Sequence, residues 1–310
     1  MGRDNRTIAI VTAASPALGS GHLQRMTTLL WHLVEVSDLD AVVVAREVGP
    51  FFPDPLRPYL RASLPDRAAL IIRDMRDSTE DDIEHLARRG PVLAIDDAGP
   101  GRALADCAID LLPNPTTGAS EPEAFIYGWG YVDSLRALAA KDASDIARDI
   151  DCAIYPGAFA DEARIERLLG LMPAGATSAV LRGAGSFVFR TGAERRPAGT
   201  CPYARLLLSS RALLSHFGVA LYESHAAGCR PLALNPTAYH ARLADLARTR
   251  LPVENLGVDG DDDDALLRRR IDAALAAPSP RAVSVHEAFD AVMSRLDAFA
   301  RIVRTLAGTR

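Results

Sequence analysis

Short, uniformly apolar segments alternate with helix-like segments along most of this chain, and this alternation limits its possible folds more than any other feature. The first three apolar segments are Ile8–Thr12, Ala41–Ala45 and Ala69–Ile72. Strands that are buried on both faces read as continuous apolar runs, whereas strands of a half-exposed sheet alternate with polar residues. The pattern therefore predicts an α/β fold in which helices cover both faces of a mainly parallel sheet.

The alternation continues through the first half of the chain and then begins again after a charged stretch at residues 141–151. In the first half, apolar residues recur at helical spacing from Leu23 to Val34, and a second helix is expected at Asp81–Arg89. The remaining strands expected in this half are Pro91–Ile95 and Ile109–Leu112. In the second half, the expected helices are Asp161–Leu171 and Leu221–Ala227, and the expected strands are Cys152–Tyr155, Thr177–Leu181, Arg205–Leu208, Ala212–Leu214 and Pro231–Leu234.

A chain of 310 residues is long enough for two such domains, each with its own core. We expect an N-terminal Rossmann-like domain at residues 1–148 and a second nucleotide-binding domain at residues 149–288. Residues 289–310 contain apolar side chains at helical spacing, from Phe289 to Leu306. This segment is expected to pack as a helix on one of the sheets, such as that of the N-terminal domain. A helix on a membrane surface is the alternative.

Composition excludes several classes of function. The 35 Lys and Arg residues are scattered and the net charge is −5, so the positive stripe of a nucleic-acid-binding protein is missing. The four cysteines stand apart without the spacing of a zinc site or a disulfide framework. No apolar run is long enough to span a bilayer, which predicts a cytoplasmic protein.

A glycine-rich loop follows the first predicted strand and leads into a helix. Gly19 and Gly21 flank Ser20, and His22 lies at the first turn of the helix. Glycines allow close approach of a ligand, and the amide groups of a helix N-terminus attract a diphosphate. The positive end of the helix dipole favours the neutral, proton-accepting form of His22, as a general base requires. Arg25, one turn further on, is a candidate phosphate ligand. The loop lacks the third glycine of a dinucleotide fingerprint and the Gly-Lys-Ser/Thr of a P-loop.

A second group of candidate ligand-binding residues lies between residues 215 and 240. His216 and Gly218 form a turn between a predicted strand and a helix, so that Gly218 would present backbone amides to phosphate. Glu223 is expected on the first turn of this helix, where its carboxylate could bind a ribose diol. Asn235 and His240 follow the next strand at its carboxyl end, the edge at which open α/β sheets contact ligands.

Several of these segments resemble one known family. Gly19–Leu29 (GSGHLQRMTTL) is similar to the glycine-x-glycine-histidine-x-x-arginine motif of the nucleotide-sugar hydrolase of pseudaminic acid biosynthesis, which is grouped with SpsG-type spore-coat glycosyltransferases. Val92–Gly99 (VLAIDDAG), with Asp96, resembles the aspartate pair of that family. Similar matches occur at Ala105–Pro115, Gly130–Arg136 and Ser215–His240.

The resemblance implies a GT-B fold, in which two Rossmann-like domains face each other across a cleft. It also implies a UDP-linked sugar as ligand, with no metal and no cofactor required. His22 would be the base that activates water, and Glu223 would be the ribose ligand. Other enzymes of cell-surface polysaccharide synthesis would be its partners. The chain departs from the family at Tyr155-Pro156-Gly157, where Gly157 would contact the nucleotide, and at Asn235-Pro236.

The hydrolase is the leading hypothesis, because the N-terminal motif matches that enzyme best. A GT-B glycosyltransferase that uses a sugar acceptor is an alternative, and the departures make a nucleotide-sugar-binding protein without activity another. An oxidoreductase built on a Rossmann-like sheet is a further hypothesis.

Overall fold

The computed structural model describes residues 7–308, apart from residues 17, 47, 49–50, 115–124, 142–145, 183–185, 192–193, 198–201 and 279–280. The chain divides into two compact units. Unit 1 contains residues 1–129 and 291–310, and unit 2 contains residues 130–290. The expected boundary at residue 148 lies about twenty residues after this division. Each unit is described by itself below.

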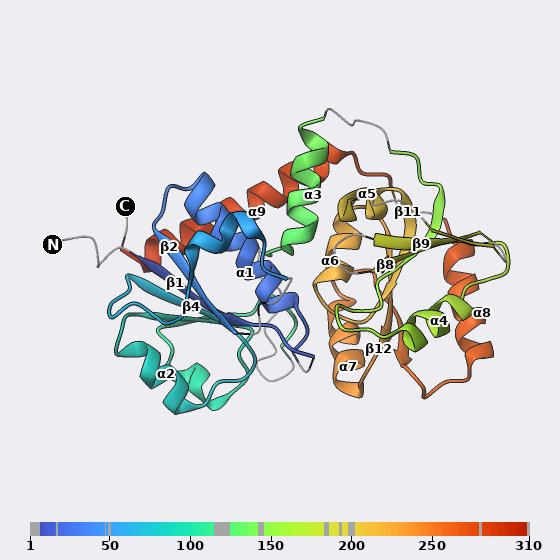
Figure 1. Ribbon diagram of the computed structural model, residues 1–310. Helices are drawn as coiled ribbons and strands as arrows, with labels where there is room; N and C mark the ends of the chain where they lie inside the picture. The colour runs from blue at the N-terminus through green and yellow to red at the C-terminus, as the bar shows by residue number, and fades with distance from the viewer. Residues whose placement is uncertain are drawn as a thin grey trace. The chain divides into compact units, whose positions relative to one another are not determined.

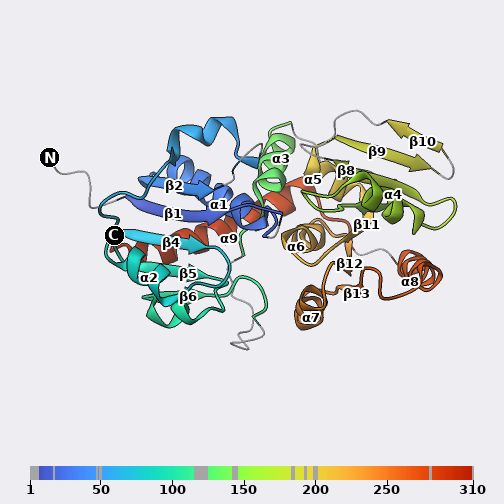
Figure 2. The same cartoon turned by 60° about the horizontal axis from the view of Figure 1, so that its bottom comes forward.

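The sheet of unit 1 is parallel, as the uniformly apolar segments predict. Its strands are β1 (Ile8–Ala13), β2 (Ala41–Arg46), β3 (Leu60–Arg61), β4 (Leu70–Asp74), β5 (Val92–Ile95) and β6 (Cys107–Ile109). They lie in the order β3-β2-β1-β4-β5-β6, which is the doubly wound order of a Rossmann domain (Figure 2). The winding direction reverses between β1 and β4, so the loops that follow these two strands are the expected position of a ligand.

Both faces of this sheet are buried. Ala9, Val42, Ile71 and Val92 are in register across four strands, and they form one core cluster with Ile83 and Leu86 of α2 (Glu80–Ala87). Their neighbours Ile10, Val43, Ile72 and Leu93 point to the opposite face and are completely buried. The other elements between the strands are α1 (Gly21–Trp31), the π-helix η1 (His32–Val36) and the 3₁₀ helices η3 (Asp54–Tyr59) and η4 (Pro100–Leu104).

A long helix from the far end of the chain completes unit 1. From Ala291 onward, α9 (Val285–Leu306) belongs to this unit, and Figures 1 and 2 show it passing along the sheet. Its apolar side chains Val292, Leu296, Phe299 and Val303 are completely buried. The imidazole Nε2 of His32 lies 3.1 Å from a carboxylate oxygen of Asp297. The helix therefore supplies a large part of the core of a unit that begins almost three hundred residues earlier.

Unit 2 repeats the same winding without any visible repeat in the sequence. Its strands are β7 (Ile150–Ile154), β8 (Thr177–Arg182), β9 (Ser186–Thr191), β10 (Glu194–Pro197), β11 (Ser210–Ser215), β12 (Arg230–Asn235) and β13 (Glu254–Val258). Their order is β10-β9-β8-β7-β11-β12-β13, and only the pairs β8–β9 and β9–β10 are antiparallel. Here the winding reverses between β7 and β11.

The helices of unit 2 are α3 (Trp129–Ala139), which begins at the division between the units, α4 (Glu162–Gly170), α5 (Tyr203–Leu208), α6 (Val219–Ala226), α7 (Ala238–Ala247) and α8 (Asp264–Ala276). Apolar residues of α4 and α8 share one core cluster with β7, β8, β11, β12 and β13. The N-terminal cap of α8 comes from the acidic run at residues 261–264: Asp263 accepts hydrogen bonds from the amides of Ala265 and Leu266.

Three details of the sequence prediction are wrong. Residues 205–208, which we expected to be a strand, belong to helix α5, because a short apolar run does not distinguish a buried strand from a buried helix. Helix α6 begins at Val219, two residues earlier than expected, so Glu223 lies on its second turn. The strand expected at Ile109–Leu112 overlaps β6 only at Ile109, and Pro115 of the family motif lies outside the described residues.

Within the part of the chain that the structure describes, no helix combines the length and the apolar composition that a membrane span requires.

Candidate functional site

The reversal point of unit 1 carries His22 and a carboxylate that the sequence analysis did not identify. His22 is the second residue of α1, directly after the loop that follows β1, and Asp74 is the last residue of β4. Nδ1 of His22 lies 2.8 Å from Oδ1 of Asp74. The Asp74 side chain is fully buried, whereas 14% of the His22 side chain is exposed. A buried carboxylate thus holds an imidazole whose ring still reaches the surface.

The ionisation of Asp74 determines where the His22 ring carries its hydrogen. Burial tends to raise the pKa of Asp74, but the charges of Arg25 and His22 outweigh it and lower this pKa to about 2. At neutral pH the carboxylate therefore only accepts hydrogen bonds, and His22 must donate through Nδ1. In the neutral ring, Nε2 is then an unprotonated base. This is the arrangement in which an aspartate orients a catalytic histidine.

Arg25 connects Asp74 to Asp96, the first aspartate of the family motif. Its Nε donates to Oδ2 of Asp74 and its Nη2 to Oδ1, both at 2.5 Å. The same Nη2 lies 2.5 Å from Oδ2 of Asp96. Arg25 is almost completely buried, and its Nη1 has no hydrogen-bond partner among the described residues. A phosphate contact of this side chain would therefore involve Nη1 or replace one of the ion pairs.

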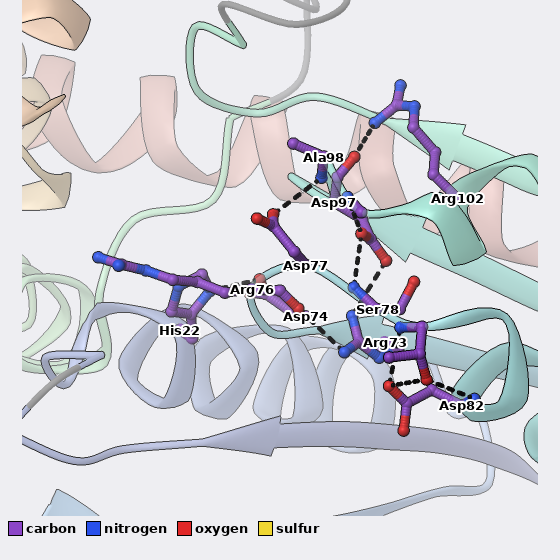
Figure 3. Close-up of polar contacts among 12 residues, drawn as sticks. His22, Arg73, Asp74, Arg76, Asp77, Ser78, Asp82, Asp97, Ala98 and Arg102 are labelled. Atoms are coloured by element: carbon purple, nitrogen blue, oxygen red, sulfur yellow. Dashed lines mark hydrogen bonds and ion pairs between the residues drawn. The ribbon is translucent and has the colours of Figure 1, made fainter.

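Asp97 organises the loops beside this group. It accepts hydrogen bonds through Oδ1 from the amides of Ser78 and Gly99, and through Oδ2 from Arg73 (Figure 3). Gly99 lies against this turn so closely that a Cβ would be 2.3 Å from the carbonyl oxygen of Ser78. The two aspartates of the IDDAG segment therefore pair with different arginines: Asp96 with Arg25, and Asp97 with Arg73.

The glycine loop before α1 is a tight turn. Gly19 has φ of +76°, and its backbone exchanges two hydrogen bonds with Ser15. Ser20 makes no side-chain cap at the start of α1, and the first turn of this helix has no acidic residue. The amide groups at Gly21 and His22 are therefore not neutralised by a capping side chain, as the proposed phosphate contact requires.

In unit 2, the predicted residues gather after β7, β11 and β12. The rings of Tyr155 and His216 are stacked with centroids 6.4 Å apart, and the His240 ring lies edge-on to His216 at 6.3 Å. Gly157 has φ of +109°, and a Cβ at this position would be 3.3 Å from the His216 ring. Burial, followed by the charges of His240 and Arg164, lowers the pKa of His216 to about 4, so this ring is neutral at physiological pH.

Asn235 and Glu223 make contacts inside unit 2. The Asn235 side chain is buried, accepts a hydrogen bond from the amide of Phe217 and donates one to Asn255. It thereby shapes the turn before Gly218, where α6 begins. Glu223 is buried and hydrogen-bonded to Tyr203, whose pKa is raised well above its usual value by burial and then by this carboxylate. A ribose that binds Glu223 would share its carboxylate with the Tyr203 hydroxyl or would displace that hydroxyl.

Sequence reasoning missed Asp74 and the tyrosines around Glu223. The strand expected at Ala69–Ile72 ended two residues early, although Asp74 follows an apolar strand in the same way as Asp96 does. The Tyr203 ring lies 6.2 Å from Tyr131 and 6.5 Å from Tyr155, two residues that are distant from it in sequence. Only the fold brings these rings together. Among the described residues, no group of His, Cys, Asp and Glu is arranged to hold a metal ion.

No protein-family model matches the chain, and no curated protein sequence is similar to it. Several solved structures share its fold. The calicheamicin glycosyltransferase CalG4 is 13% identical, with 99% of both chains covered and a TM-score of 0.56. The spinosyn rhamnosyltransferase SpnG, solved with thymidine diphosphate, is 14% identical over 97% of this chain and 99% of its own, with a TM-score of 0.57. MnaA of S. aureus, solved with UDP, is 9% identical over 98% of both chains, with a TM-score of 0.55.

These similarities establish that the chain has the GT-B fold, with two α/β units built on parallel sheets.

Proposed function

We propose that this protein is an enzyme that cleaves or transfers the sugar of a nucleotide-diphosphate sugar, with His22 as its general base. The observation that carries the proposal is the 2.8 Å contact between His22 Nδ1 and the buried Asp74. This pair lies where the winding of the unit 1 sheet reverses, in a chain with the GT-B fold. Since Asp74 is ionised, it keeps the hydrogen on Nδ1 and leaves Nε2 to accept a proton from a hydroxyl group.

In the proposed reaction, His22 Nε2 removes the proton of a hydroxyl as its oxygen bonds to the anomeric carbon of the donor sugar. The bond between this carbon and the diphosphate oxygen breaks, and the nucleoside diphosphate leaves with both electrons. Asp74 stabilises the imidazolium that forms. The nucleophile is either the hydroxyl of an acceptor or water.

Unit 2 is the proposed binding site of the nucleotide. UDP and thymidine diphosphate are the nucleotides found with MnaA and SpnG, so a pyrimidine nucleotide is the first choice for this chain, and UDP follows from the motif resemblance. Gly157 follows β7, and His216 and Gly218 follow β11; the winding of the sheet reverses between these two strands. The His240 ring lies beside His216. Gly218 has no side-chain cap, which leaves amides at the start of α6 for the diphosphate.

The glycine-histidine motif before α1 supports the finer assignment, a hydrolase like that of pseudaminic acid biosynthesis that acts in the cytoplasm with other enzymes of cell-surface polysaccharide synthesis. Transfer to a sugar acceptor uses the same base and the same donor. Product analysis of the donor reaction distinguishes the two, because the hydrolase releases free sugar without an acceptor.

The first experiment measures thermal unfolding of the protein with UDP, CMP, GDP, dTDP, NAD and ATP. A ligand that binds the folded state at a hundredfold excess over its Kd stabilises the protein by about 2.7 kcal/mol. UDP or dTDP should raise the Tm, and the other ligands should not. A rise with NAD alone would instead indicate an oxidoreductase.

The second experiment tests the role of His22 with the His22→Asn variant, assayed with the UDP-sugars selected by the first screen. Loss of the base should lower turnover by about 10²- to 10⁴-fold, while the Tm rise with UDP is retained. Ser20→Ala, at the neighbouring position, should keep turnover within a few-fold.

A nucleotide-sugar-binding protein without activity is the second candidate. It is favoured by the internal hydrogen bonds of Asn235 and Glu223, which occupy two predicted ligand groups. This alternative predicts a Tm rise with UDP but no turnover by the wild-type protein with any UDP-sugar or acceptor.

A further inference from the structure

Arg25 and Asp96 lie behind the His22–Asp74 pair, where neither contributes a group to the proposed reaction. The Nη2 of Arg25 is shared between Oδ1 of Asp74 and Oδ2 of Asp96. Oδ1 of Asp74 in turn accepts from both Arg25 and His22. The four side chains thus form one connected group, from Asp96, whose side chain is 10% exposed, to His22, whose side chain is 14% exposed. Within this group, Nη2 of Arg25 also lies 3.4 Å from Nδ1 of His22.

Asp96 is itself fixed to the backbone through the carboxylate oxygen that does not face Arg25. Its Oδ1 accepts hydrogen bonds from the amides of Leu111 and Leu112, at 2.6 and 2.9 Å. Its backbone has φ of +51°, one of the two positive values among the described non-glycine residues. A left-handed conformation is unfavourable for a residue with a side chain, and it persists where surrounding contacts hold it. The carboxylate that holds Arg25 is therefore anchored to the chain after β6.

The planar guanidinium of Arg25, held by Asp96, in turn fixes the orientation of the Asp74 carboxylate. Arg25 binds both oxygens of Asp74 through Nε and Nη2, so the plane of the carboxylate follows the plane of the guanidinium. Only one orientation of that plane directs Oδ1 toward Nδ1 of His22. A lysine at position 25 would keep the charge but would lose the fork that fixes this plane.

We propose that Arg25 and Asp96 are positioning residues for His22: Asp96 orients the guanidinium, and the guanidinium orients the Asp74 carboxylate that holds the imidazole hydrogen on Nδ1. This inference deepens the proposed function, since it assigns the residues that prepare its base. The alternative is that the Arg25 pair only stabilises unit 1.

The neighbouring pair Arg73–Asp97 provides a matched control. Arg73 and Asp97 are adjacent in sequence to Asp74 and Asp96, and they form an ion pair at 3.1 Å. No contact described for either residue involves His22. A merely structural role of Asp96 would make Asp96→Asn and Asp97→Asn behave alike at His22.

The test is a two-bond ¹⁵N–¹H NMR spectrum of the full-length protein with labelled histidine, in which the His22→Asn variant assigns the His22 signals. In the wild type, His22 should show a protonated Nδ1 and an unprotonated Nε2. Asp96→Asn and Arg25→Lys should both move these signals toward the average of the two ring tautomers. Asp97→Asn should lower the Tm and leave the His22 signals in place.

The proposal is overturned if folded Asp96→Asn and Arg25→Lys retain the wild-type His22 signals, or if Asp97→Asn shifts them equally. Two variants at different positions guard against a failure of one to fold. This measurement does not use catalysis, so it remains decisive if the protein has no activity on nucleotide sugars. Where turnover is measurable, Asp96→Asn should lower kcat by up to about 100-fold with little change in KM for the donor.

Discussion

At the scale of single residues, the predicted candidates differ in what surrounds them. His22 and His216 both follow strands at reversal points of their sheets, but His22 contacts an ionised carboxylate and His216 contacts aromatic rings. The sequence predicted both histidines from their positions in turns before helices. It could not predict their partners, because Asp74 is 52 residues from His22 and Tyr155 is 61 residues from His216 in the chain.

Gly157 provides a test of how closely unit 2 is packed around His216. Gly157→Ala should destabilise the protein by about 1–3 kcal/mol, because φ of +109° disfavours a side chain and the new Cβ would press on the His216 ring. Urea unfolding measures the change. Gly175→Ala is the control, since Gly175 also has a positive φ, +86°, but a Cβ there would meet no atom within 4 Å. An equal effect of both substitutions would show that the His216 contact is unimportant.

At the scale of elements, the sequence predicted most strands and helices of both units because their apolar runs have clear ends. Residues 205–208 were assigned to the wrong element, since the three consecutive leucines at 206–208 suit either a strand or a helix and α5 is only six residues long. The strand order could not be predicted from periodicity, although β1 and β7 are the central strands on which both sheets are wound.

Helix α9 gives the clearest prediction for a single element. Phe299 is completely buried, so Phe299→Ala should reduce the free energy of unfolding by about 3–5 kcal/mol. Arg295→Ala, on the exposed side of the same helix, should change it by less than about 0.5 kcal/mol. Denaturant unfolding followed by tryptophan fluorescence suits this test, because Trp31 and Trp129 both belong to unit 1, with ring centroids 5.9 Å apart. A small effect of Phe299→Ala would mean that α9 contributes little to the stability of unit 1.

At the scale of the whole molecule, two units with the same winding carry different chemistry: a histidine–carboxylate pair in unit 1 and an aromatic turn in unit 2. No internal repeat in the sequence revealed this duplication, because parallel sheets need only apolar strands and covering helices, which many sequences supply. The GT-B fold was predicted from motif resemblance rather than from these patterns.

The two units should respond to acid in different pH ranges. The pKa of His216 falls from its ordinary value of 6.5 to about 4 in the folded protein, so the unfolded state binds its proton first. Stability of unit 2 should therefore fall as the pH is lowered from about 6.5 to about 4, by at most about 1.4 kcal/mol per pH unit. For Asp74 the pKa falls from 3.8 to about 2, and this contribution to unit 1 is lost only over that lower range.

Urea unfolding at several pH values measures these two pH ranges. Tryptophan fluorescence reports the unfolding of unit 1, and the NMR signals of Tyr155 and Tyr203 report the unfolding of unit 2. His216→Gln should weaken the pH dependence of unit 2 above pH 4, whereas His85→Gln, on the exposed side of α2, should not. A pH dependence of unit 2 that is unchanged in His216→Gln would contradict the assignment.

Unit 1 is assembled from two stretches of chain that are separated by the whole of unit 2. During synthesis on the ribosome, the strands of unit 1 emerge first, but the apolar side chains of α9 that complete their core emerge only after residue 290. All residues of unit 2 are then already available to fold. The unit that carries the proposed base is therefore begun before unit 2 and completed after it. Its incompletely covered sheet must remain soluble while the nascent chain grows by another 160 residues or so.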